Sequence, residues 1–166
     1  MLEVEIPWDE TRAFVEDLTR GGARFIVDGS VALRFHVPAA PEWQFARDLD
    51  VLLEPSAQMH GELNGALLRA GAQPTEATVE QFIKGNCGFS SKRVLNIDFR
   101  VPTPAEFSRF WADAAAVGIA RSTARTQVAS ITTLEHFYGR ALNVPDRAER
   151  AAKALEALAR ARRDTA

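Results

Sequence analysis

Two aspartates, Asp48 and Asp50, stand two positions apart at the start of Asp48–Leu53, a segment that otherwise contains only leucine and valine. Such a composition is typical of a strand, and side chains two apart on a strand share one face, roughly 6–7 Å apart. Leu49 and Val51 would then face the core, and both carboxylates the other way. Two carboxylates on one edge can bind the same Mg²⁺, a hard cation that also accepts phosphate oxygens.

A third aspartate, Asp98, lies in the almost strictly alternating segment Val94–Val101. One face of this expected strand is apolar and carries Leu95, Ile97, Phe99 and Val101. Asp98 projects from the opposite, polar face, where it could meet Asp48 and Asp50. The alternative is a solvated ion pair between Asp98 and an arginine such as Arg100.

A turn of small residues, Asp28-Gly29-Ser30, joins the apolar run Phe25–Val27 to a segment of helical character, Val31–Phe35. Glycine lets a backbone approach a phosphate closely, and a helix N-terminus presents unpaired N–H groups with a partial positive charge. Ser30 adds a hydroxyl donor and is the expected N-cap of the helix. The turn predicts a phosphate-binding element formed by Gly29 and Ser30; the alternative is an ordinary strand-to-helix turn.

The elements that position these residues alternate along the first two thirds of the chain. A helix is expected from its N-cap Asp9 to about Arg20, and another over the helically spaced apolar residues between Met59 and Ala70. Two strands are expected at Thr78–Lys84 and Arg93–Val101, joined by the polar turn Gly85–Lys92.

The last third reads as helices. Thr103-Pro104-Ala105-Glu106 is a helix start with a capping box, and two more helices are expected at Ser130–Leu142 and Pro145–Arg163. The apolar residues that would join these helices to the sheet are Phe107, Phe110, Trp111, Leu134 and Leu158. The expected fold class is therefore α+β of the α/β type: a mixed sheet flanked by helices, with a helical C-terminal third. We expect one domain over residues 1–166, with a core at about 23–101 and a helical region at about 103–163.

The composition excludes several classes of protein. Of the 166 residues, 46% are hydrophobic and 25% charged, which excludes a disordered or collagen-like chain. The net charge of −2 provides no overall basic field for nucleic acid. The single cysteine, Cys87, allows no intrachain disulfide. With an acidic N-terminus and no apolar stretch near the ~20 residues of a membrane span, we expect a cytoplasmic protein without a membrane partner.

Taken in order, these features resemble the polymerase-β-like nucleotidyltransferase superfamily. Its pattern is a Gly-Ser turn opening a helix, Asp-x-Asp on the next strand and one Asp on a later strand, here Gly29-Ser30, Asp48-Leu49-Asp50 and Asp98. The set spans about residues 23–101. The tail, with Val128–Leu134, Gly139-Arg140 and Pro145–Arg147, is similar to that of small bacterial members, namely AbiEii-like toxin nucleotidyltransferases and lincosamide or aminoglycoside nucleotidyltransferases.

The resemblance implies an enzyme of the EC 2.7.7 type. Asp48, Asp50 and Asp98 would hold two Mg²⁺ ions, replaceable by Mn²⁺, and Asp98 would be the candidate general base or second-metal ligand. A nucleoside monophosphate would pass from a nucleoside triphosphate to a hydroxyl on a tRNA, a protein or an aminoglycoside-like small molecule. For the toxin type, the resemblance also implies a toxin–antitoxin system, with an antitoxin or a second copy of the chain as candidate partners.

Two departures from the superfamily pattern leave alternatives open. Asp28 places an extra acid at the expected phosphate site, and Leu134–Tyr138 lacks the lysine common in AbiEii-like tails. The triphosphate would then depend on other cations, for which the candidates are Arg47, Lys84, Arg100 and Arg140. One alternative is a degenerate, non-catalytic nucleotidyltransferase-fold binding module. A Mg²⁺-dependent nuclease is a third hypothesis, disfavoured because Lys84 and Lys92 are expected to flank a turn rather than the acids.

Overall fold

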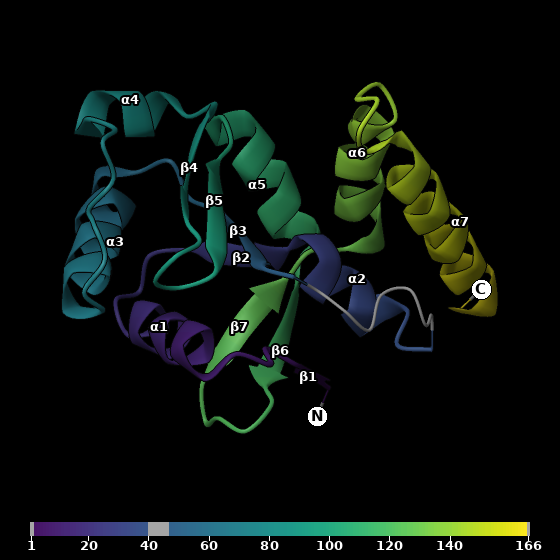
Figure 1. Ribbon diagram of the computed structural model, residues 1–166, viewed down its shortest axis with the longest axis horizontal. Coiled ribbons are helices and arrows are strands. Elements are labelled where there is room, and N and C mark those ends of the chain that lie inside the picture. Colours follow the sequence, from purple (N-terminus) through teal and green to yellow (C-terminus); the bar gives the residue numbers. More distant parts are fainter. Residues whose placement is uncertain (1, 40–46, 166) are drawn as a thin grey trace.

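The computed structural model describes residues 2–39 and 47–165 (Figure 1). Within these residues, seven strands form one mixed sheet in the order β1-β6-β7-β2-β3-β5-β4. The strands are β1 (Glu3–Val4), β2 (Phe25–Asp28), β3 (Leu49–Leu53), β4 (Cys87–Ser91), β5 (Ile97–Val101), β6 (Ala115–Ile119) and β7 (Arg125–Val128). The expected class, a mixed sheet with flanking helices and helices at the C-terminus, is confirmed.

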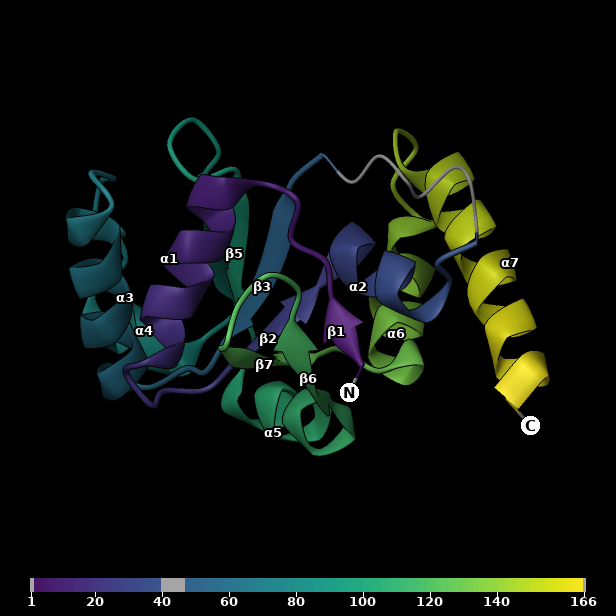
Figure 2. The ribbon, with the colours of Figure 1, turned by 90° about the horizontal axis from the view of Figure 1, so that it is seen from below.

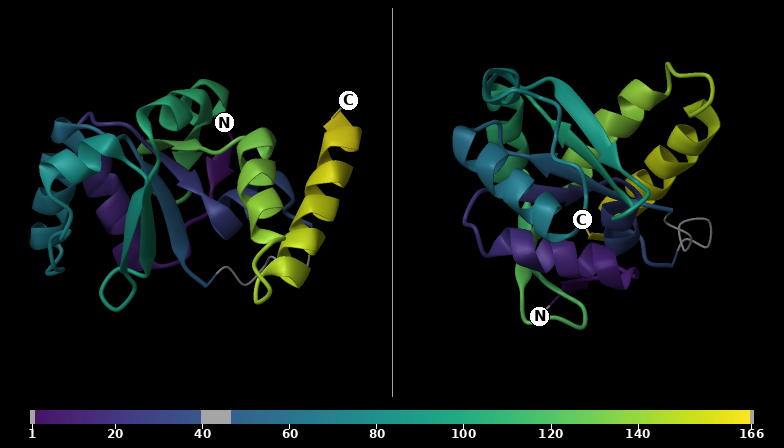
Figure 3. Two further views of the ribbon diagram at one scale, coloured as in Figure 1. Left: turned by 90° about the horizontal axis from the view of Figure 1, so that it is seen from above. Right: turned by 60° about the vertical axis from the view of Figure 1, so that its left-hand side comes forward.

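The helices gather into groups around this sheet. They are α1 (Asp9–Thr19), α2 (Gly29–His36), α3 (Ala57–Arg69), α4 (Val79–Lys84), α5 (Pro104–Asp113), α6 (Ile131–Ala141) and α7 (Ala148–Thr165). Helices α1 and α3 lie side by side at the β4–β5 end, next to α4 (Figure 2). On the opposite side of the molecule from α3 and α4, α6 and α7 form an adjacent pair that packs against α2 (Figure 3). None of the helices in the described parts of the chain has both the length and the apolar character needed to cross a bilayer.

The strand register decides which side chains meet. Strand β2 pairs antiparallel with β3 so that Asp28 is opposite Asp50, and β3 pairs parallel with β5 so that Asp50 is opposite Asp98. Strand β4 is antiparallel to β5 and places Ser90 opposite Asp98. Because directly paired residues point to the same face, these side chains form a row across four adjacent strands.

The expected apolar faces pack largely as predicted. Phe107, Phe110, Leu134 and Leu158 are buried, and Trp111 is half-buried against the core. The helix start at Thr103 is also confirmed, because the Thr103 side chain accepts from the Glu106 N–H and the Glu106 side chain accepts from the Thr103 N–H. Burying each large apolar side chain contributes about 1.5–3 kcal/mol, which anchors α5, α6 and α7 to the sheet.

The prediction for residues 78–92 was wrong. Residues 79–84 form helix α4, which begins with a capping box between Thr78 and Gln81. The expected turn Gly85–Lys92 contains strand β4, and the hairpin turn lies at residues 92–95 instead. Strand β4 was missed because a strand at the edge of a sheet needs little apolar character. Helix α4 was missed because the local hydrogen bonds of its capping box outweigh strand propensity in a short segment.

Smaller differences concern the ends of elements and the region after residue 103. Trp8, not Asp9, is the N-cap of α1, and α2 begins at Gly29 with Asp28 as its N-cap, so that Ser30 is the second helical residue. Strands β6 and β7 lie between α5 and α6, where the sequence analysis placed no strand. With β1 they extend the sheet beyond residues 23–101 on the β2 side.

Candidate functional site

Asp48, Asp50 and Asp98 converge, as the strand alternation predicted. Asp50 and Asp98 project from the interiors of β3 and β5, and Asp48 lies one residue before β3. One carboxylate oxygen from each residue lies within 4.8 Å of the others. The donor set can therefore bind a metal ion.

These carboxylates line a cavity of about 580 Å³ between the sheet and the C-terminal helices. The size lies within the range of ligand pockets, about 300–1,000 Å³. Gly29 and Ser30 line the cavity at the start of α2, and residues of α6 and α7 form the facing wall. The structure thus brings the small-residue turn and the acids into one space, as expected; phosphate contact by Gly29 and Ser30 stays a prediction.

Burial and mutual repulsion disturb the ionisation of the acids. Burial raises the pKa of Asp50 to about 7, with further increases from the negative charges of Asp48, Asp28 and Asp98. The pKa of Asp48 is raised first by burial and then by its hydrogen bond and charge interaction with Asp98. Like charges at close range resist ionising together, and an added cation would relieve this repulsion.

Asp28 adds a fourth carboxyl group to the cavity. Its side chain is only 5% exposed, and burial raises its pKa to about 6, partly offset by the Gly29 N–H and the charge of Arg100. Among the residues that the structure describes, none donates a hydrogen bond to Asp28 Oδ1. A buried polar group without a partner costs about 1–3 kcal/mol, so this oxygen is suited to meet a donor on a ligand.

Gly29 leaves space for the carboxylate of Asp50, a steric role that was not predicted from the sequence. Its φ of +63° lies in the left-handed region, and a Cβ added there would lie 2.1 Å from Asp50 Oδ2. Glycine at this position therefore leaves the space that the Asp50 carboxylate occupies. The same residue opens α2 and clears room for the central acid.

The cations around the cavity differ from those expected. Of the four candidates from the sequence, Arg100 lines the cavity, whereas Arg47, Lys84 and Arg140 are not among its lining residues. The Arg47 carbonyl oxygen instead accepts a hydrogen bond of 2.8 Å from Asn96 Nδ2. The lining cations that sequence reasoning missed are Lys92, Arg147 and Arg150.

Lys92 lies next to the acids, contrary to expectation. Its Nζ is 3.3 Å from Asp98 Oδ2 and 3.8 Å from Asp48 Oδ2. The correct hairpin alignment would have revealed this proximity, because Ser90 is opposite Asp98 and Lys92 follows two residues later. The earlier objection to a nuclease, that no lysine lies near the acids, is therefore wrong.

Aromatic side chains of α6 line the cavity. The Arg100 guanidinium carbon lies 4.7 Å from the Phe137 ring centroid, a cation–π contact that fixes the arginine beside the acids. Tyr138 is another lining residue, and burial, with smaller contributions from Asp28 and Asp50, raises the pKa of its hydroxyl. This segment of α6 thus presents aromatic rings where the resemblance implied a lysine.

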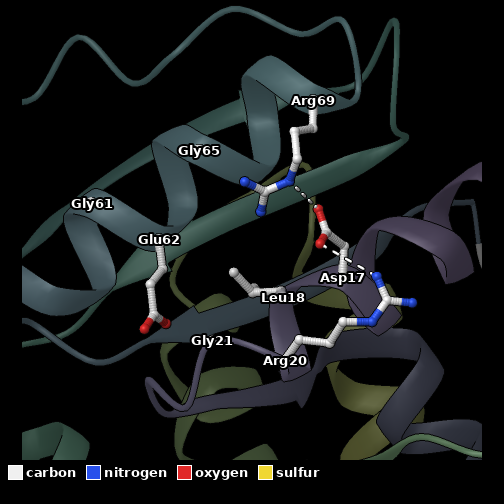
Figure 4. Close-up of a pocket in the computed structure, with 8 residues that line it drawn as sticks. All are labelled: Asp17, Leu18, Arg20, Gly21, Gly61, Glu62, Gly65 and Arg69. Carbon is white, nitrogen blue, oxygen red and sulfur yellow. Dashed lines mark hydrogen bonds and ion pairs between the residues drawn. The ribbon is translucent and has the colours of Figure 1, made fainter.

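A second, smaller cavity of about 290 Å³ lies between α1 and α3 (Figure 4). Its polar groups are paired with one another: Arg69 Nε is 2.9 Å from Asp17 Oδ2, and Arg20 also pairs with Asp17. Glu62 accepts a hydrogen bond from the Ala23 N–H. These contacts join two helices and a loop, so the cavity has a structural explanation.

Comparison with known proteins adds evidence on the fold. No family model and no curated protein matches the chain. Among solved structures, an antigenic nucleotidyltransferase-like protein from Paracoccidioides brasiliensis matches with a TM-score of 0.50 and 10% sequence identity, over 90% of this chain and 75% of that one. This chain has a nucleotidyltransferase-like fold. The acid triad on this fold is consistent with the polymerase-β-like pattern.

We predict that Gly29→Ala weakens divalent-ion binding, because the new Cβ must displace the Asp50 carboxylate. An alanine in the left-handed region of backbone conformation also lowers the free energy of unfolding by about 1–2 kcal/mol. Gly71→Ala is the matched control, since Gly71 has φ +77° with nothing within 4 Å of an added Cβ. Urea denaturation should show reduced stability in both variants. Titration calorimetry with Mn²⁺ should show weakened binding only in Gly29→Ala. An unchanged Mn²⁺ affinity in Gly29→Ala would contradict the steric role.

The raised pKa values of Asp28 and Asp50 predict how stability depends on pH. Both groups bind protons more tightly in the folded chain than in the unfolded chain, where the ordinary value is 3.8. The contribution of these two groups to the free energy of unfolding is therefore favourable at low pH, and it is lost as pH rises through about 6 to 7. Each unit of pKa difference corresponds to about 1.4 kcal/mol.

The measurement is urea denaturation at pH 5 and pH 8 in chelator, for the parent chain and for Asp28→Asn. Asparagine removes the cost of ionising a buried carboxyl, so the stability of the variant relative to the parent should be higher at pH 8 than at pH 5. An equal relative stability at both pH values would show that burial does not raise the pKa of Asp28.

Proposed function

We propose that this chain is a Mg²⁺-dependent nucleotidyltransferase that moves a nucleoside monophosphate from a nucleoside triphosphate to a hydroxyl acceptor. The observation that carries the proposal is the convergence of Asp48, Asp50 and Asp98 in a nucleotide-sized cavity. The nucleotidyltransferase-like fold supports it. The proposed site residues are the three acids together with Gly29 and Ser30; Arg47 is a weaker candidate because it is not among the residues that line the cavity.

The three acids fit a divalent metal site. Their ligand atoms lie within 4.8 Å of one another, and carboxylate oxygens are the ligands that Mg²⁺ and Mn²⁺ prefer. Burial, and after it the charges of neighbouring carboxylates, raises the pKa values of Asp48 and Asp50, and a bound cation would favour their ionised forms. When bound by Asp48, Asp50 and Asp98, two such ions would neutralise phosphate charge and make the acceptor hydroxyl more acidic.

The other cavity residues suit the remaining parts of the reaction. The positive end of α2, which begins at Gly29 and Ser30, and the guanidinium of Arg100 favour the negative charge of a triphosphate. Asp98 would accept the proton of the acceptor hydroxyl while the hydroxyl oxygen forms its bond to the α-phosphorus. The bond from the α-phosphorus to the bridging oxygen would break, and pyrophosphate would leave with its electron pair.

A Mg²⁺-dependent nuclease is the second candidate, because Lys92 lies 3.3 Å from Asp98 Oδ2. The fold and the small-residue turn at the start of α2 favour nucleotidyl transfer over it. A non-catalytic module is supported by the aromatic residues that α6 places at the cavity, and opposed by the converged acids. The acceptor, whether tRNA, protein or aminoglycoside-like molecule, and a toxin role with an antitoxin partner remain proposals from the family resemblance.

One experiment separates these functions. The chain is incubated with each α-labelled nucleoside triphosphate, Mg²⁺ and one of three acceptor pools: tRNA, total protein or aminoglycosides. A transferase should attach label to one pool and release pyrophosphate. A nuclease should instead shorten end-labelled nucleic acid in the presence of Mg²⁺, and a binding module should do neither while still being stabilised by a triphosphate.

We predict that Asp50→Asn lowers nucleotidyl transfer by about a hundredfold or more, because it removes a charged metal ligand. The variant should melt at the same or a higher temperature in chelator, since it removes a charge that repels Asp28, Asp48 and Asp98. Asp113→Asn, at the exposed end of α5, is the control and should keep full activity. Full activity of Asp50→Asn, or a clearly lower melting temperature, would show that Asp50 is a structural residue.

A further inference from the structure

Lys92 lies where a divalent ion would compete with it. Its ammonium is 3.3 Å from one carboxylate oxygen of Asp98 and 3.8 Å from one of Asp48, two of the three proposed metal ligands. A divalent ion on the same oxygens would bring its charge within a few ångströms of the ammonium. At such distances two positive charges repel appreciably even in water, so ion and ammonium cannot both remain there without cost.

The surroundings of Lys92 allow it to leave. Its side chain is 60% exposed and extends from the hairpin turn at residues 92–95, outside the strands themselves. Among the described residues, its ion pairs are those with Asp48 and Asp98. An exposed pair of this kind is weak, and a lysine stem can swing away without disturbing the core.

The other lining cations are held differently. Arg100 packs its guanidinium on the Phe137 ring, 4.7 Å from the centroid, and so stays with α6. Arg147 and Arg150 come from the segment around the start of α7, on the wall that faces the sheet. Lys92, by contrast, pairs with two acids of the triad and lies on a turn, outside the strands.

From this arrangement, and building on the proposed function, we infer that Lys92 is an exchangeable counterion of the metal site. It pairs with Asp48 and Asp98 when no divalent ion is bound, and it releases them when an ion enters. The ammonium then remains beside the same cavity, where the phosphate oxygens of a bound triphosphate can accept its hydrogen bonds. Lys92 thereby weakens the binding of a bare metal ion and favours an ion that arrives with a triphosphate.

Such an exchange makes metal and nucleotide binding cooperative. A bare ion must displace the ammonium into solvent, whereas an ion accompanied by a triphosphate gives the ammonium a new anionic partner. Each ligand then increases the affinity for the other by the same factor. The residue that links them is a side chain outside the proposed ligand set, so its replacement leaves the metal ligands intact.

The test measures Mn²⁺ binding by calorimetry, with and without a non-hydrolysable nucleoside triphosphate analogue. Lys92→Gln should bind Mn²⁺ alone about fivefold more tightly than the parent, as expected from the loss of weak exposed ion pairs. It should also bind the analogue more weakly in the presence of Mn²⁺, so that the coupling between the two ligands falls. Lys92→Arg keeps the charge and should remain near the parent in both measurements. Lys84→Gln, an exposed lysine that does not line the cavity, is the matched control and should behave as the parent.

The outcomes separate this inference from the proposed function. If the parent chain and all variants fail to bind Mn²⁺, the metal site itself is absent and both proposals fall. If all bind Mn²⁺ with equal affinity and equal coupling to the analogue, the metal site stands and the counterion role of Lys92 is overturned. If Lys92→Gln binds Mn²⁺ more weakly than the parent, Lys92 supports the metal site instead of competing with it, and the inference is again overturned.

Discussion

The pairing register of β2, β3 and β5 is the constraint on which the site depends. It places Asp28 opposite Asp50 and Asp50 opposite Asp98, so that three carboxyl groups lie in one row on one face of the sheet. A register shift of a single residue would turn a strand's polar side chains into the core and its apolar ones into the cavity. The apolar faces of the same strands, with Leu49, Val51 and Ile97 fully buried, therefore hold the acids in place.

This row of acids is costly in the absence of added positive charge. Burial raises the pKa values of Asp28, Asp48 and Asp50, and repulsion from neighbouring carboxylates adds to the increase at Asp48 and Asp50. One oxygen of Asp28 lacks a partner among the described residues. Lys92 and Arg100 offset part of the charge: the Lys92 side chain is exposed, and the Arg100 guanidinium lies over the Phe137 ring. Sites that bind cations commonly combine such strain with a stable scaffold, because the ligand supplies the missing interactions. Here the apolar burial in the core of the sheet offsets the free-energy cost of the clustered acids.

Strand periodicity predicted the essential part of the site from the sequence. Alternation alone placed Asp50 and Asp98 on the face opposite Leu49 and Phe99, because apolar burial specifies which way a strand faces. It could not say which strands are neighbours. The pairing of β3 with β5 depends on contacts between distant segments, and only the order of motifs in the resemblance suggested it.

Apart from α4, which depends on its local capping box, the misses share one physical cause: the structures concerned depend on neighbours that are distant in sequence. Strand β4 is polar enough to read as a turn because it lies at the sheet edge, and misplacing it by several residues hid the contact of Lys92 with the acids. Arg147 and Arg150 were missed because they reach the cavity only when α7 packs beside α6. Phosphate approach at Gly29 stays a prediction, but its second role, leaving space for the Asp50 carboxylate, was missed because it depends on the pairing of β2 with β3.

The most direct test of the central claim is a crystal structure of the chain with Mn²⁺ and a non-hydrolysable nucleoside triphosphate analogue, with anomalous scattering used to locate manganese. We expect anomalous peaks that mark manganese ions coordinated by Asp48, Asp50 and Asp98, with the triphosphate of the analogue bound at the N-terminus of α2. Manganese bound elsewhere, or an analogue bound outside the cavity while these three carboxylates hold no metal, would contradict it.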